Sequence, residues 1–448
     1  MEMLAEEDCL EIANAALAQV RPSLHARCLA LSDTTSGRSV LAMLDQILVS
    51  AANFLLLVAV ARSVATAETG RYVLALRAVD FITEIQNVFL WAPYTLFAPE
   101  REGNNRRTYA GSVLIHQLAA CLATVTLMGA FAWGAFCLHA DSAGLIALCA
   151  MAASPGIHAR EFTRRICFAN LDLWTAFSMD GSVLVLQTIG IATLYSTHRL
   201  SAWSVLLVTS VSCGLGALAC LASLRNRFAV LRADIMPSFK ENFSYGRWLL
   251  GSDLALLISN QLYPWFLSFF SGPASVALFA ASQALTNFAR MFLIGAQNVL
   301  LPSSARAFAS RNWTDLCDMV KRSTVVLGSG AGLFSLLCLV AGGPALRLIY
   351  GRTFASSGLL VFALSLSILT SAVTLAPTFA LAAARRADVN LRINAITLTF
   401  HVIAGLILTF FYHAQGAAYS LALGGLLAAA LRWRVYRTLI GSRKEIAS

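Results

Sequence analysis

The stretch YVLALRAVDFITEIQNVFLWAP, residues 72–93, decides how the rest of the chain is interpreted. It is long and apolar enough to cross a membrane, yet it carries Arg77, Asp80 and Glu84 and ends at Pro93. On a helix the three charges are spaced i, i+3 and i+7, so they share one face. A charge at the bilayer centre costs about 2.5–3.5 kcal/mol on insertion scales, and this face is therefore expected to meet protein or a water-filled cavity.

The composition indicates a polytopic membrane protein. Of 448 residues, 58% are hydrophobic and 12% are charged, and the mean hydropathy is +0.69; soluble domains carry about 25% charged residues. The apolar runs are continuous rather than alternating, which predicts an all-α fold and not a β-barrel. Pro155 and Gly156 interrupt the fourth predicted span ahead of the basic stretch Arg160–Arg165. The twelve predicted spans are 40–61, 72–96, 109–134, 143–157, 174–196, 202–224, 247–270, 275–301, 323–343, 358–382, 391–412 and 415–436.

The distribution of basic residues sets the orientation of these spans. With the N-terminus in the cytoplasm, 26 of the 33 Lys and Arg residues fall on the cytoplasmic side, which follows the positive-inside rule. The net charge of +10 therefore indicates topology rather than nucleic-acid binding, and both termini are predicted to be cytoplasmic. Two arginines, Arg77 and Arg290, lie inside spans, and five lie on the outer side: Arg62, Arg71, Arg199, Arg347 and Arg352.

An internal repeat predicts two halves. Asp45 begins the first span and Pro93 ends the second; Asp253 and Pro302 have the same places in the seventh and eighth spans. The segment IQNVFLWAP (85–93) is echoed by GAQNVLLP (295–302). Both copies have the same orientation, so we expect two parallel six-helix halves around a central cavity. The predicted divisions are a cytoplasmic extension (1–39), the first half (40–224), a cytoplasmic linker (225–246), the second half (247–437) and a cytoplasmic tail (438–448).

Polar residues inside the spans are the candidate site. Four carboxyl groups are candidates for ion pairs or for coupling transport to H⁺ or Na⁺: Asp45, Asp80, Glu84 and Asp253. The alternative is that Arg77 pairs with Asp80 or Glu84, and Arg290 with Asp253, only to hold helices together. The candidate substrate-binding residues are Arg77, Gln283, Asn287 and Arg290, with Asn260 and Gln261 on the seventh span.

Cysteine and histidine give no sign of a metal, a cofactor or a catalytic group. Most of the ten cysteines lie in or beside apolar spans, without CxxC spacing, and buried cysteine behaves as a small hydrophobic residue. The seven histidines are scattered singly. We therefore predict no metal site, no cofactor and no catalytic residue.

Four stretches resemble a known family. They are ETGRYVLALRAVDFITEIQNVFLWAP (68–93), AREFTRRICFANLDLWTAFSMDGSVLVLQ (159–187), VALFAASQALTNFARMFLIGAQNVLLPSSARAFA (276–309) and ALRLIYGRTFASSG (345–358). Together they resemble bacterial oligosaccharide flippases, the Wzx-like polysaccharide biosynthesis proteins of the multidrug/oligosaccharidyl-lipid/polysaccharide exporter superfamily. The 39-residue extension is longer than that family usually carries.

The resemblance implies transport and not chemistry. A lipid-linked oligosaccharide on a polyprenyl diphosphate would be moved across the bacterial cytoplasmic (inner) membrane for surface polysaccharide synthesis, by alternating access of the two halves. Arg77 and Arg290 would hold its diphosphate. Membrane lipids, a polysaccharide polymerase and glycosyltransferases are the implied partners. Two alternatives remain: a multidrug/cation antiporter of the same superfamily, whose cavity would favour acids, and a membrane-embedded polysaccharide polymerase or ligase, which would need a large external loop.

Overall fold

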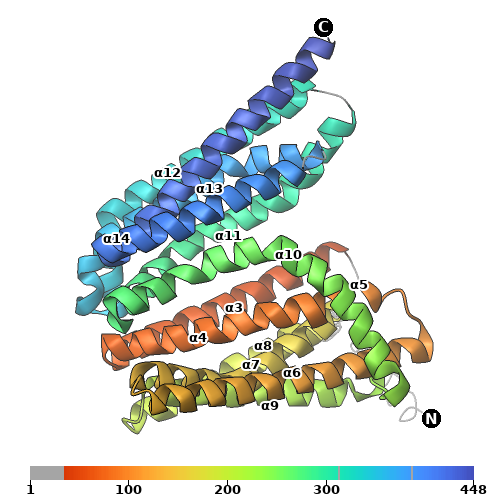
Figure 1. Ribbon diagram of the computed structural model, residues 1–448, viewed down its shortest axis with the longest axis vertical. Helices are drawn as coiled ribbons and strands as arrows, with labels where there is room; N and C mark the ends of the chain where they lie inside the picture. Colours follow the sequence, from red (N-terminus) through yellow and green to blue (C-terminus); the bar gives the residue numbers. More distant parts are fainter. Residues whose placement is uncertain (1–34, 311–312, 385–386, 448) are drawn as a thin grey trace, which may run out of the picture.

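The computed structural model describes residues 35–310, 313–384 and 387–447, and within these ranges the chain is helical and has no strand (Figure 1). Most of the predicted extension, residues 1–34, lies outside the described residues. The helices are α3 (Thr35–Ser63), α4 (Thr66–Gln86), the π-helix η1 (Asn87–Trp91), α5 (Ala92–Phe97), α6 (Gly103–Cys137), α7 (Asp141–Ala169), α8 (Leu173–Ser196), α9 (Ala202–Ser223), the 3₁₀ turn η2 (Arg225–Arg227), α10 (Arg232–Ser271), α11 (Pro273–Ala309), α12 (Trp313–Tyr350), the 3₁₀ segment η3 (Arg352–Ser357), α13 (Gly358–Ala383) and α14 (Ala387–Ala447).

The twelve predicted spans all lie on these helices, which confirms the all-α polytopic fold. The second span consists of α4, η1 and α5 in succession, and α14 contains the last two. His413 separates those two because its backbone is non-helical, with φ 52° and ψ −131°. Within the described residues, nine helices are long and apolar enough to cross a membrane by length and composition. The charged α4 is not among them.

The helices form two halves that share one core at one end, which is the outer end in the orientation predicted from the basic residues. The first half contains α3–α9 and the second contains α10–α14, above it in Figure 1. One apolar cluster joins α4 to α11 and α13 through residues such as Tyr72, Phe279 and Leu364. Toward the cytoplasmic end each half has its own cluster, one around Phe162 and another around Leu316. The halves therefore share a core at the predicted outer end and have separate cores toward the predicted cytoplasmic end.

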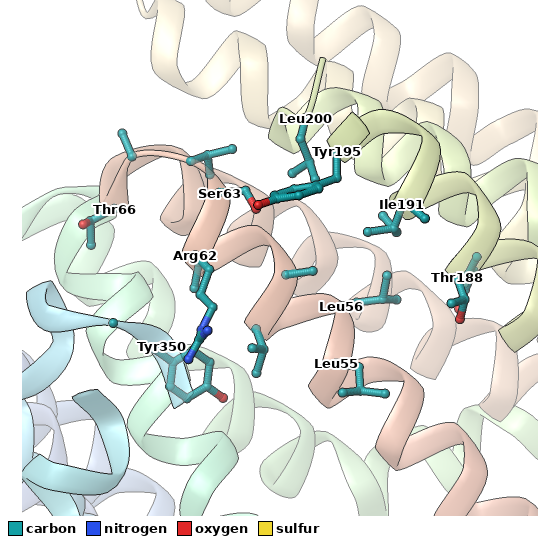
Figure 2. Close-up of a pocket in the computed structure, with 18 of the residues that line it drawn as sticks. Leu55, Leu56, Arg62, Ser63, Thr66, Thr188, Ile191, Tyr195, Leu200 and Tyr350 are labelled. Atoms are coloured by element: carbon teal, nitrogen blue, oxygen red, sulfur yellow. The ribbon is translucent and has the colours of Figure 1, made fainter. Parts of the chain in front are cut away.

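Two contacts close the outer end between the halves. A Cβ built on Gly70 of α4 would lie 1.7 Å from the carbonyl oxygen of Pro273 at the start of α11, so only glycine permits this approach of the two helices. Arg62, at the end of α3, donates from Nε to the carbonyl oxygen of Ile349 at 2.7 Å and from Nη2 to that of Leu348 (Figure 2). These carbonyls belong to the last turn of α12, where the helix provides no partner of its own.

The predicted linker 225–246 consists of η2 and the first part of α10. That helix continues without a break from Arg232 to Ser271 and contains Pro237 and Pro264. Its first part packs on α6 and η1, with the Phe243 ring stacked 5.3 Å from Phe89, and its last part packs on α14. One helix therefore connects the two halves, on the side that the sequence predicts to be cytoplasmic.

The prediction that Pro155 and Gly156 interrupt the fourth span was wrong, because α7 continues through both residues to Ala169. The N–H of Gly156 donates to Ser210 Oγ of α9 at 3.2 Å. A Cβ on Gly156 would lie 1.8 Å from the Ser210 carbonyl oxygen. The Pro-Gly pair thus permits close packing of α7 on α9, and neighbouring helices satisfy backbone groups that proline disturbs.

Candidate functional site

A cavity of about 660 Å³ lies between the halves, and we call it the central cavity. Its walls come from α3, α4, α7, α8 and α9 of the first half and from α11 of the second. Four predicted site residues lie on these walls, two from each half: Arg77, Asp80, Gln283 and Asn287. The sequence therefore located side chains that the fold brings together, and the roles assigned to them stay predictions.

Arg77 and Asp80 form an ion pair on α4. The Arg77 Nη1 atom lies 3.1 Å from Asp80 Oδ2, and the two side chains are 33% and 48% exposed. Water or a ligand can therefore reach both groups in the central cavity. Glu84, one turn further along α4, is exposed and is not part of the cavity wall.

The remaining predicted residues lie on α10 and α11. Arg290 lies on the same face of α11 as Asn287, almost one turn closer to the cytoplasm, and it is exposed. Among the side chains that the structure describes, which exclude that of Asp253, none forms an ion pair with Arg290. Gln261 is half-buried, with its side-chain oxygen unbonded, and it is not on the cavity wall. The side chains of Asp253 and Asn260 lie outside the described residues.

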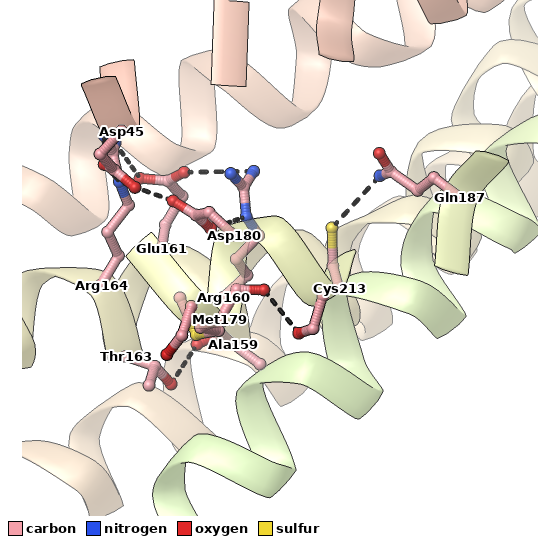
Figure 3. Close-up of polar contacts among 12 residues, drawn as sticks. Asp45, Ala159, Arg160, Glu161, Thr163, Arg164, Met179, Asp180, Gln187 and Cys213 are labelled. Atoms are coloured by element: carbon pink, nitrogen blue, oxygen red, sulfur yellow. Dashed lines mark hydrogen bonds and ion pairs between the residues drawn. The ribbon is translucent and has the colours of Figure 1, made fainter. Parts of the chain in front are cut away.

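A buried group of charges, which we call the charge network, joins α3, α7 and α8 (Figure 3). The Arg160 Nε atom is 2.7 Å from Asp180 Oδ1. Arg164 bridges two acids, with Nη2 at 2.5 Å from Asp45 Oδ2 and Nε at 3.1 Å from Asp180 Oδ2. Glu161 completes the network, 3.8 Å from Arg160. Three carboxyl groups thus share two guanidinium groups.

The charge network corrects two expectations. Asp45 pairs with Arg164 rather than with Arg77 or Arg290. Arg160 and Arg164, which the interrupted fourth span placed beyond the end of its helix, belong instead to α7 and are only 11% and 12% exposed. Spacing i, i+4 on one helix was the available signal, but it appears only if the helix is continued past Pro155. Arg160 and Glu161 also line the central cavity, so the network is one of its walls.

A chain of buried hydrogen bonds through two glutamine amides, which we call the amide chain, connects α4 to its neighbouring helices. His158 Nδ1 lies 3.2 Å from Gln86 Nε2, Gln117 Nε2 donates to Gln86 Oε1 at 2.9 Å, and Trp91 Nε1 donates to Gln117 Oε1 at 2.9 Å. These groups join α7, α4, α6 and η1. The π-helix η1 directly precedes Pro93, which has no N–H for a regular helical bond. These hydrogen bonds fix the direction in which α4 continues into α5.

Comparisons with known proteins show the family to which this chain belongs. The profile of a family described as "Polysaccharide biosynthesis protein" matches residues 38–308. A comparison with curated protein sequences found no match. Among solved structures, an inward-facing multidrug resistance MATE family transporter of the MOP superfamily has a TM-score of 0.69 at 12% identity, covering 89% of this chain and 96% of its own.

Two further structures refine the comparison. The lipid II flippase MurJ in an inward closed conformation also has a TM-score of 0.69, at 16% identity, with coverage of 89% of this chain and 87% of its own. An outward-facing MATE family transporter has a lower TM-score of 0.58 at 14% identity, with coverage of 91% and 95%. These likenesses concern the fold alone.

Proposed function

We propose, because the chain belongs to the polysaccharide biosynthesis protein family, that it is a flippase for a lipid-linked oligosaccharide carried on a polyprenyl diphosphate. The chain is a multi-pass membrane protein with a transporter fold. The observation that carries the proposal is the charge balance of the central cavity. Both acids on its described wall, Asp80 and Glu161, have an arginine partner. Arg290 beside it is exposed and has no ion pair among the described side chains, which do not include that of Asp253. Such a cavity suits an anion.

The same balance disfavours a cation as substrate. A cation would need a carboxylate free to receive it, and each acid on the described wall already contacts a guanidinium group. A diphosphate can instead take the place of Asp80 at Arg77, because the planar guanidinium binds phosphate through two parallel hydrogen bonds.

The transport step follows from the two halves. The oligosaccharide head enters between the separated cytoplasmic ends while its lipid tail stays in the membrane. Parting of the outer ends then presents the head to the other side, as in alternating access. The surrounding system in this proposal is a bacterial inner membrane, with both termini cytoplasmic and with a polymerase and glycosyltransferases as partners.

The charge network is the proposed coupling element. It holds three acids (Asp45, Glu161 and Asp180) and two arginines (Arg160 and Arg164), with Cys213 of α9 as a neighbouring titratable group (Figure 3). Buried charges are costly unless paired, and three acids share two guanidinium groups, so the network favours uptake of one H⁺, which neutralises the third acid. Because Arg160 and Glu161 also line the central cavity, ion and substrate can affect each other there.

The test is a deletion strain complemented with variants. Arg77→Ala and Arg290→Ala should abolish surface polysaccharide and leave lipid-linked oligosaccharide on the inner leaflet, with unchanged membrane insertion. Asp80→Asn should have a smaller effect, and Arg322→Ala, an exposed arginine of α12 away from the cavity, serves as the matched control. Normal polysaccharide from both arginine variants refutes the anion-binding cavity. Altered drug tolerance with normal polysaccharide in the deletion strain supports the antiporter instead.

A further inference from the structure

Three of the five outer-side arginines line one groove. It has a volume of about 1190 Å³ and lies at the outer ends of α3 and α8 in the first half and of α12 and η3 in the second (Figure 2). We call it the outer groove. Its arginines are Arg62, Arg347 and Arg352. Since the positive-inside rule depletes this side of basic residues, gathering most of the remaining ones in a single groove calls for a ligand.

The outer groove has no acid on its wall: none of its described lining residues is Asp or Glu. Arg347 and Arg352 are exposed and form no ion pair with a residue in the described ranges. Arg62 donates only to the backbone carbonyls of Leu348 and Ile349, which leaves its positive charge uncompensated by a carboxylate. The groove is therefore a concentrated positive site at the outer membrane face.

The rest of the wall is mainly apolar, with Gln187, Thr188 and Tyr195 among its polar members, and it extends from the arginines along α3 and α8. The lining includes Leu55 and Leu56 of α3 and Ile191 of α8 (Figure 2), together with Leu184 of α8, and Leu55 is 57% exposed. A positive end continuous with an apolar channel matches an amphiphile that has an anionic head and a hydrocarbon tail.

We propose that the outer groove binds the diphosphate and the first isoprene units of the translocated lipid after it has reached the outer leaflet. This inference rests on the proposed function and adds a product-side site to it, distinct from the central cavity. A diphosphate diester carries two negative charges, which three arginines without acids accommodate better than the single charge of a phospholipid phosphodiester. The site would hold the product away from the central cavity before release.

The experiment locates the lipid by cross-linking in the full-length protein in membranes. The photoreactive residue p-benzoyl-phenylalanine replaces Tyr195 to report on the outer groove, or Phe288 to report on the central cavity. The probe is radiolabelled polyprenyl diphosphate. Each reporter is tested in three backgrounds. The first has no further change, the second combines Arg347→Gln with Arg352→Gln, and the third carries Arg199→Gln. Arg199 serves as the control because it is an outer-side arginine that is not on the groove wall.

We expect both reporters to be labelled. The double variant should lower groove labelling about tenfold or more, from the loss of two charge-assisted contacts, and leave cavity labelling unchanged. Arg199→Gln should change neither. If the central cavity is labelled and the outer groove is not, this inference is overturned and the proposed function stands. If neither site is labelled, the inference and the proposed function are both overturned. Equal competition by excess phosphatidylglycerol would also overturn it, because the groove would then be a general phospholipid site.

Discussion

Substitution of Gly70 by alanine should shift the protein away from the state in which its outer end is closed. The added Cβ would lie 1.7 Å from the carbonyl oxygen of Pro273, against 3.4 Å for an ordinary contact, so α4 and α11 must part by about 1.7 Å. Overpacking of this kind costs about 1–3 kcal/mol. Because the blocked contact joins the two halves, most of that cost disappears when the outer ends separate.

The size of the shift follows from this cost. At 1.4 kcal/mol for each factor of ten, the ratio of closed to open outer ends should fall about 5- to 150-fold. Double electron–electron resonance measures the distance between spin labels at Ala65 and Thr353, which are exposed positions on opposite halves. The native cysteines are replaced beforehand so that only these two positions carry labels. The distance distribution should gain a longer component.

The matched control is Gly134→Ala in α6, where an added Cβ meets nothing within 4 Å. Its distance distribution should equal that of the unsubstituted chain, and its thermal stability should not fall, because alanine is the better helix former. If Gly70→Ala gives the same distribution as Gly134→Ala, the contact does not control the outer end and the reasoning is refuted.

Three further outcomes are expected. Asp180→Asn leaves Arg160 with a weakened partner and should cost about 3–5 kcal/mol, seen as a lower thermal midpoint in detergent; replacing both residues with apolar ones should recover most of it. Gln117→Leu removes the acceptor of the Trp91 indole N–H and should cost about 1–3 kcal/mol, so an unchanged midpoint would contradict the amide chain. Arg62→Met removes the bonds to α12 and should lengthen the same spin-label distance as Gly70→Ala; a shorter distance would be the contrary result.

Much of the candidate site was accessible from periodicity along single helices. The spacing of Arg77 and Asp80 on one helix, and of Gln283 and Asn287 on another, put each pair on one face, and the fold brings both faces to the central cavity. The charged positions could be recognised without a structure because lipid does not tolerate them.

The charge network could not be recognised in the same way. Asp45 and Arg164 are 119 residues apart, and no local pattern joins them. The prediction that the helix ends at Pro155 placed Arg160 and Arg164 outside it. In the structure the helix continues, and Ser210 of α9 provides the hydroxyl that accepts a hydrogen bond from the Gly156 N–H. That partner lies on another helix and appears only when the helices are packed.

The sequence by itself determined that this is a polytopic helical membrane protein, and it put Arg77 and Asp80 on one face of a helix and Gln283 and Asn287 on one face of another. Hydropathy and helical period are local properties of the chain, and the membrane selects on them directly. Only the tertiary structure decided which charges pair, that the halves meet at Gly70 and Pro273, and that three outer arginines share one groove. Those features depend on contacts between helices distant in sequence, which the residues of one helix cannot specify alone.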